Sequence, residues 1–250
     1  MTCTRCYDPL TNDNFRSLDL YLAPKSSKDS PLVVFIHGGA WRTEDKADYK
    51  DLCLGFNKRG ISVASVNYRL SLKEHPDAIP QVQHPDHIMD VGKAIEYLYN
   101  TSEGHYNPHQ IYIVGHSAGA HIALMLLLDT VYHQYIAGVI GVSGIYDIPL
   151  LLKTFPSYTD FIVQAFGADQ SRFLDASPIS KTSTQLGHKP IIIAHSPQDT
   201  LIDHQQPECM VAHLQQFHPN VVLDMTLKGD HYEIMKTETL EQVVKQIIQK

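Results

Sequence analysis

Short apolar runs alternate with longer segments of helical period along most of the chain. The run Leu32–Ile36 is unbroken, β-branched and aromatic, which predicts a buried strand. After Pro85, apolar residues recur every three or four positions as far as Leu98, and this spacing predicts a helix with one buried face. The same patterns predict strands over 18–22 (an edge strand), 61–66, 111–114, 136–142, 190–194 and 221–227, and helices over 45–59, 118–128, 205–217 and 237–248. This alternation indicates an α/β protein with a mainly parallel central sheet flanked by helices.

Residues 147–188 interrupt the alternation. This segment is rich in proline, glycine and aromatic residues, and it is too short to build a hydrophobic core of its own. A length of 250 residues still fits a single core. We therefore expect one domain over residues 1–250, with residues 147–188 as a small cap-like insertion over the edge of the sheet.

The composition excludes several classes of protein. Hydrophobic residues make up 43% of the chain and charged residues 19%, a balance typical of globular proteins. The net charge is −7 and no block of basic residues occurs, so we expect no nucleic-acid partner. The longest apolar runs are far shorter than the roughly 18–20 residues of a membrane span, and the first residues do not resemble a secretory signal. We expect a cytoplasmic protein that does not bind membranes.

The cysteines and histidines do not form a familiar metal motif. Cys3 and Cys6 make a single C-x-x-C, whereas Cys53 and Cys209 are isolated. The 15 histidines include no H-E-x-x-H, and the glycine motifs that bind nucleotides are absent. We therefore expect no metal and no cofactor.

The sequence Gly115-His116-Ser117-Ala118-Gly119 lies between a predicted strand and a predicted helix. A serine in this context lies on a sharp strand-to-helix turn, where flanking glycines allow the backbones to approach closely. The N-terminus of the helix also presents free N–H groups to negative charge on a substrate. Ser117 is therefore the predicted nucleophile. The alternative is an unreactive glycine-rich turn.

A second glycine-rich loop, His37-Gly38-Gly39-Ala40-Trp41, follows the strand Leu32–Ile36. Acyl transfer requires N–H donors directed at the oxyanion of the tetrahedral intermediate. Glycines leave their own N–H groups uncovered, and Ala118 supplies another N–H directly after the nucleophile. We predict an oxyanion hole made by Gly38, Gly39 and Ala118.

A serine hydroxyl needs a base to remove its proton, and the base needs an acid to orient it. Asp199 follows the predicted strand 190–194, and His231 follows the predicted strand 221–227. The chain order serine, aspartate, histidine is that of the α/β-hydrolases. Asp203, four residues beyond Asp199, is the alternative acid. Asp230 is expected to point away from its neighbour His231.

Aromatic residues gather in and near residues 147–188. We assign Trp41 and Tyr146 to a predicted apolar substrate pocket, with the alternative that each packs the insertion onto the sheet. Further aromatic candidates for this pocket are Phe155, Tyr158, Phe161 and Phe166.

Four motifs together resemble the kynurenine formamidase (arylformamidase) branch of the α/β-hydrolase superfamily, from about Pro31 to the C-terminus. They are His37-Gly38-Gly39-Ala40-Trp41, Gly115-His116-Ser117-Ala118-Gly119-Ala120-His121, Ser143-Gly144-Ile145-Tyr146-Asp147 and Asp230-His231-Tyr232. A fifth segment, Asn67-Tyr68-Arg69-Leu70, looks more like the Y-R-L-A-P-E of related carboxylesterases, although Ser71 and Leu72 replace the Ala-Pro.

This resemblance implies an α/β-hydrolase fold and cofactor-independent hydrolysis of N-formylkynurenine to kynurenine and formate, a step of tryptophan catabolism. It implies Ser117 as nucleophile, Asp199 as acid, His231 as base and the Gly38–Gly39 loop as oxyanion hole. A general carboxylesterase acting on short-chain or aromatic esters is the alternative activity, and a catalytically idle binding protein is a further one. The expected partner is a small-molecule substrate, and a homodimer is left open.

Overall fold

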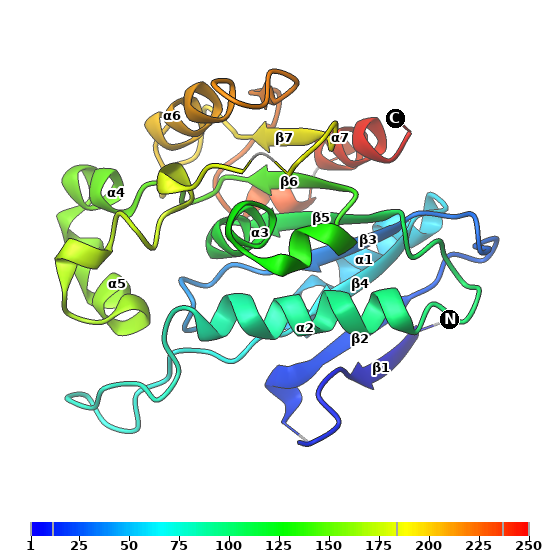
Figure 1. Ribbon diagram of the computed structural model, residues 1–250, viewed down its shortest axis with the longest axis horizontal. Helices are drawn as coiled ribbons and strands as arrows, with labels where there is room; N and C mark the ends of the chain where they lie inside the picture. The colour runs from blue at the N-terminus through cyan, green and yellow to red at the C-terminus, as the bar shows by residue number, and fades with distance from the viewer. Residues whose placement is uncertain (1, 12, 184, 237, 250) are drawn as a thin grey trace.

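In a computed structural model, residues 2–11, 13–183, 185–236 and 238–249 are described, and within them one eight-stranded sheet runs through the molecule (Figure 1). The strand order is β1-β2-β4-β3-β5-β6-β7-β8. The first two pairings, β1 with β2 and β2 with β4, are antiparallel, and every later pairing is parallel. The strands are β1 (Thr2–Cys6), β2 (Ser17–Tyr21), β3 (Leu32–Ile36), β4 (Ser62–Val66), β5 (Ile111–His116), β6 (Gly138–Val142), β7 (Ile191–Ala194) and β8 (Val222–Asp224).

Helices cover both faces of this sheet. Figure 1 shows α2 and α3 in front of the sheet and α1 behind it. The apolar side chains of α2, α3 and α6 join one buried cluster, and those of α1 and α7 join a second cluster on the other face. The helices are α1 (Lys50–Lys58), α2 (Asp86–Asn100), α3 (Ala118–Asp129), α4 (Ile148–Thr154), α5 (Thr159–Phe166), α6 (Gln205–Leu214) and α7 (Glu238–Ile248). The layered α/β architecture predicted from the alternation is confirmed.

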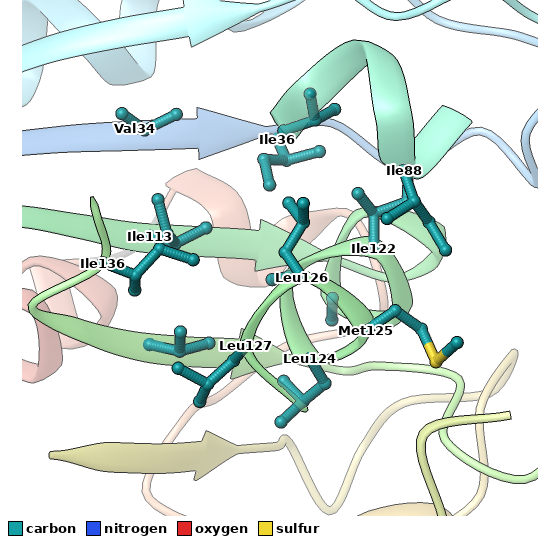
Figure 2. Close-up of a cluster of buried hydrophobic side chains, with 14 of the residues drawn as sticks. Val34, Ile36, Ile88, Ile113, Ile122, Leu124, Met125, Leu126, Leu127 and Ile136 are labelled. Carbon is teal, nitrogen blue, oxygen red and sulfur yellow. The ribbon is translucent and has the colours of Figure 1, made fainter. Parts of the chain in front are cut away.

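Helix α3 is buried on every side. All residues from Ala118 to Leu128 are buried, because the helix packs on β5 and β6 and is flanked by α2 and by the 3₁₀ turns Val131–Tyr135 and Pro178–Ser180. Figure 2 shows its side chains reaching in several directions, toward Val34 and Ile36 of β3, Ile113 of β5 and Ile88 of α2. A helix that is apolar all round requires such a position. The consequence for function is that the N-terminus of α3, next to Ser117, is held in a rigid core.

Several predicted elements need correction. The strand predicted over 221–227 is only β8, Val222–Asp224, and the helix predicted over 205–217 is α6, which ends at Leu214. The strand predicted over 18–22 is β2, but it lies between β1 and β4 and is therefore not an edge strand. The edge is β1, whose mainly exposed, polar residues gave no hydrophobic signal. The helix predicted over 45–59 begins as a 3₁₀ turn, Lys46–Tyr49, before α1. Thr237, the predicted start of the last helix, lies outside the described residues.

Residues 147–188 contain α4 and α5 together with short 3₁₀ turns. In Figure 1 these two helices lie side by side at the left, beyond the ends of β6 and β7. The carboxyl ends of parallel strands are where open α/β sheets bind ligands. Among the described residues, no helix is both long enough and apolar enough to cross a membrane.

Candidate active site

Ser117 lies on the turn between β5 and α3 in a strained backbone conformation. Its φ is 54° and its ψ is −117°, values that residues other than glycine rarely adopt. The turn is tight because glycines flank it: a Cβ at Gly115 would lie 2.2 Å from the Gly119 carbonyl oxygen, and one at Gly119 would lie 2.2 Å from the Ile36 carbonyl oxygen. The geometry is that expected of a nucleophile elbow.

His231 and Asp199 are in direct contact, although 32 residues separate them. His231 Nδ1 lies 2.8 Å from Asp199 Oδ2. A carboxylate can only accept a hydrogen bond, so Nδ1 carries the proton and Nε2 is left as the basic nitrogen. This is the tautomer that a general base for a serine needs.

Asp199 is held as a carboxylate. Burial by itself would raise its pKa, but the hydrogen bond and charge of His231 and the N–H of Ile202 outweigh burial and lower the pKa to about 2. Asp199 Oδ1 accepts from the N–H groups of Leu201 and Ile202, at 2.9 and 3.0 Å. The alternative acid, Asp203, instead accepts from the N–H of Gln205 at the start of α6. Geometry therefore favours Asp199 as the partner of His231.

His116 joins the serine turn to the histidine loop. Its Nε2–H donates to the carbonyl oxygen of His231 at 3.0 Å, and the two imidazole rings are 4.6 Å apart. Burial and the neighbouring His231 lower the pKa of His116 to about 3, so this ring is neutral. The residue directly before Ser117 thus contacts the predicted base, which brings the two loops together.

The loop after β3 differs from its prediction at Gly38. The N–H of Gly38 donates to Glu44 Oε2 at 3.1 Å, so it is not free to bind an oxyanion in this structure. Gly39, Ala40 and Trp41 have φ values of 77°, 51° and 58°, a run of three left-handed residues. Position 38 remains close to the nucleophile, because a Cβ there would lie 3.0 Å from Ser117 Cβ.

In two neighbouring peptide groups of this loop the carbonyls accept hydrogen bonds, whereas the N–H groups have no partner among the described residues. Tyr68 donates to the Gly38 carbonyl at 2.7 Å, and the N–H of Thr43 donates to the Gly39 carbonyl at 2.9 Å. In a trans peptide the N–H points away from the carbonyl, so the donors left over are those of Gly39 and Ala40. Among the described residues, no acceptor is paired with these two groups or with the N–H of Ala118. Ala40, which the sequence prediction did not name, is therefore a further candidate donor, and its only signal in the sequence was its place after two glycines.

Trp41 and Tyr146 do not line an open pocket, contrary to the prediction. Both side chains are fully buried. The Trp41 ring packs edge-on against His121 and Phe166, at centroid distances of 5.1 and 4.8 Å. Tyr146 packs its hydroxyl against Gly141 and Gly144, where no side chain fills the space. The left-handed turn of the loop directs Trp41 inward, which sequence alone did not reveal.

The predicted nucleophile and the predicted base are themselves nearly enclosed. Ser117 is 7% exposed and His231 2% exposed. Tyr232, the residue after His231, is half exposed. It borders a cavity of about 590 Å³ that also includes Glu44 and Tyr49. Within the described residues, no three His, Cys, Asp or Glu side chains converge as a metal site would require.

Comparison with known proteins identifies the family of the chain. Residues 18–214 match the family model BD-FAE. A kynurenine formamidase from Meyerozyma guilliermondii is 34% identical over 197 residues, covering 73% of this chain and 71% of that protein. A probable isoprenylcysteine alpha-carbonyl methylesterase ICME from Oryza sativa subsp. japonica is 35% identical over 151 residues, covering 55% of this chain and 34% of that protein.

Solved structures show the same fold. A truncated carbohydrate esterase from gut microbiota superposes with a TM-score of 0.80 over all of this chain and 97% of that chain, at 18% sequence identity. The fold is that of the α/β-hydrolases, as the sequence predicts. The chain belongs to the BD-FAE family. It is accordingly a hydrolase.

Proposed function

We propose that the protein is a cofactor-independent serine hydrolase that converts N-formylkynurenine to kynurenine and formate. The observation that carries the proposal is the pairing of His231 Nδ1 with Asp199 Oδ2, which leaves the basic Nε2 available beside the loop of Ser117. The 34% identity to a kynurenine formamidase supports the choice of substrate.

In the proposed reaction, Ser117 Oγ attacks the formamide carbonyl carbon while His231 takes the hydroxyl proton. The oxyanion that forms accepts hydrogen bonds from the N–H groups of Gly39, Ala40 and Ala118. His231 then gives its proton to the leaving arylamine nitrogen, and the C–N bond breaks. Water, deprotonated by the same imidazole, hydrolyses the formyl ester on Ser117 to formate.

The enclosure of Ser117 favours a small acyl group. Ser117 is 7% exposed, and a Cβ at position 38 would lie only 3.0 Å from Ser117 Cβ, so little space remains beside the nucleophile. Formyl is the smallest acyl group, and it suits such a site. The likeness to a methylesterase keeps short-chain esters as the second candidate substrate class.

The test is a comparison of kcat/KM for N-formylkynurenine with kcat/KM for the formate, acetate and butyrate esters of p-nitrophenol. We expect formamide hydrolysis, and ester turnover that falls by about tenfold or more for each methylene added to the acyl group. Turnover of the esters with none of the formamide would assign the protein to the carboxylesterases. Turnover of none of them would support the idle binding protein.

We further propose that the protein works in the cytoplasm on a small-molecule substrate. All four cysteines are free thiols, which suits a reducing compartment. Fractionation of cells expressing the full chain would test this location.

A further inference from the structure

Glu44 lies in the loop after β3 with a backbone conformation that favours glycine. Its φ is 74°, in the left-handed region that side chains with a Cβ rarely adopt. A glutamate held in such a conformation needs contacts that fix it there. Those contacts are at its carboxylate.

The Glu44 carboxylate connects the loop after β3 to the 3₁₀ turn Lys46–Tyr49. Oε2 accepts from the N–H of Gly38 at 3.1 Å and from the hydroxyl of Tyr49 at 2.7 Å. The Tyr49 side chain is buried and its ring packs against Phe35 of β3, at 4.6 Å between centroids. The carboxylate is therefore anchored to the sheet through Tyr49, and it accepts the hydrogen bond from the Gly38 N–H in this fixed position.

Gly38 is bound at both ends. Glu44 accepts from its N–H, and the buried hydroxyl of Tyr68 donates to its carbonyl at 2.7 Å. The Gly38 carbonyl belongs to the same peptide group as the N–H of Gly39. Because that peptide group is planar, fixing Gly38 at both ends fixes the direction of the Gly39 N–H.

We infer that Glu44 is a positioning residue for the oxyanion hole: its carboxylate, anchored by Tyr49, holds Gly38 so that the N–H of Gly39 is directed at the substrate oxyanion. The inference rests on the proposed function, since it assumes attack by Ser117. Glu44 does not touch the substrate in this account. Its effect arises because donors that are already oriented need no reorganisation when charge develops on the carbonyl oxygen.

Four variants separate this role from a general effect of charge or folding. E44A removes the acceptor, and E44G removes it in a residue that adopts a φ of 74° without strain. E44Q keeps an amide oxygen that can accept from both Gly38 and Tyr49. D51N is the matched control, because Asp51 lines the same cavity as Glu44 and is exposed, but it makes no contact with the Gly38 loop that the structure records.

Two readouts are needed. For hydrolysis, we expect E44A and E44G to lower kcat by about 10- to 100-fold with KM little changed. We expect E44Q and D51N to keep most of the wild-type kcat. The second readout is the affinity for phenylboronic acid, measured by calorimetry. Its boron accepts the Ser117 oxygen while the hydroxyl proton passes to His231, giving a tetrahedral anion that occupies the oxyanion hole.

Boronate affinity should fall in E44A and E44G by about the same factor as kcat, and E44Q should restore it. Equal boronate affinity in wild type, E44A and E44G would overturn the inference, as would a loss in E44Q as large as that in E44A. Boronate binding needs no turnover, so the role of Glu44 is tested even if the formamide proves to be the wrong substrate. Absence of any boronate adduct on wild-type Ser117 would instead overturn the proposed serine mechanism, and with it this inference.

Discussion

Asp230 binds Thr200 across the two loops that carry the predicted acid and base. Asp230 Oδ1 accepts from the N–H of Thr200 at 2.9 Å and from its hydroxyl at 2.8 Å. The same oxygen accepts from the N–H of His231 at 2.8 Å. One carboxylate oxygen of Asp230 thus binds both the backbone of His231 and Thr200, and it ties the loop of Asp199 to the loop of His231.

Replacing Asp230 should therefore impair the reaction without removing a reacting group. For D230A we expect kcat to fall by about 10- to 100-fold, because the His231 ring loses its fixed position. D230N keeps an oxygen acceptor and should lose less. Steady-state kinetics on purified variants check this, with unfolding curves to show that both are folded. An unchanged kcat in D230A would mean that the loops hold their positions without Asp230.

The assignment of the acid is tested by a pair of isosteric changes. D199N should lower kcat by about 10³- to 10⁴-fold, because an amide can donate to Nδ1 and so favour the wrong tautomer of His231. D203N is the control, since Asp203 contacts only the start of α6 among the hydrogen bonds recorded for it. Its kcat should stay close to wild type. The reverse pattern would transfer the acid role to Asp203.

The buried histidines make stability depend on pH. Burial lowers the pKa of His37 to about 4 and those of His87, His116 and His121 to about 3. The unfolded chain, with a histidine pKa near 6.5, binds protons that the folded protein excludes as the pH falls from about 6.5 to 4. The free energy of unfolding should therefore fall in this window, by at most about 1.4 kcal/mol per pH unit for each histidine.

Urea unfolding at about pH 7 and about pH 5 measures this dependence. H121Q is an informative variant, because a glutamine amide can replace the hydrogen bond from His121 Nε2 to the Ala176 carbonyl and does not titrate. Its stability should depend less steeply on pH than that of the wild type. A free energy of unfolding that is equal at both pH values would contradict the neutral, buried state of these rings.

Trp41 should behave as a core residue. For W41A we expect the free energy of unfolding to fall by about 3–5 kcal/mol, because the ring is fully buried against His121 and Phe166. The KM of the folded fraction should change little, since no substrate reaches the ring. A large rise in KM with unchanged stability would show instead that Trp41 lines the substrate pocket, as the sequence predicts. Denaturant unfolding and initial-rate kinetics on the same preparation decide between the two.

Local pattern predicted the fold well where the signal was hydrophobic. The strand Leu32–Ile36 was bounded correctly because five consecutive apolar residues are buried on both faces of a parallel sheet. Asp199 could be placed against His231 because residues at the carboxyl ends of parallel strands meet at one edge of the sheet. Strand β1 was missed, since Thr2–Cys6 is mostly exposed and carries no apolar alternation.

Two kinds of feature could not be predicted from sequence: hydrogen bonds between side chains and the backbone, and the burial of particular aromatic side chains. From the sequence, the N–H of Gly38 is a plausible free donor, because glycine leaves it uncovered. Only the fold shows that the Glu44 carboxylate accepts a hydrogen bond from it. Trp41 and Tyr146 are aromatic residues near the site, and composition cannot distinguish a pocket wall from a core residue. For Trp41, the left-handed turn at Gly39, Ala40 and Trp41 places the ring in the core. A positive φ at Ala40 and Trp41 cannot be predicted from sequence, because residues other than glycine rarely adopt it.

The central claim is that Ser117 is a nucleophile activated by His231, and covalent labelling tests it most directly. A fluorophosphonate probe should attach to the intact protein, and peptide mass mapping should place the adduct on Ser117. S117A should take no label, D199N should react far more slowly than wild type, and D203N should react at the wild-type rate. A wild-type protein that stays unlabelled, or an S117A variant that is labelled as fast as the wild type, would contradict the account.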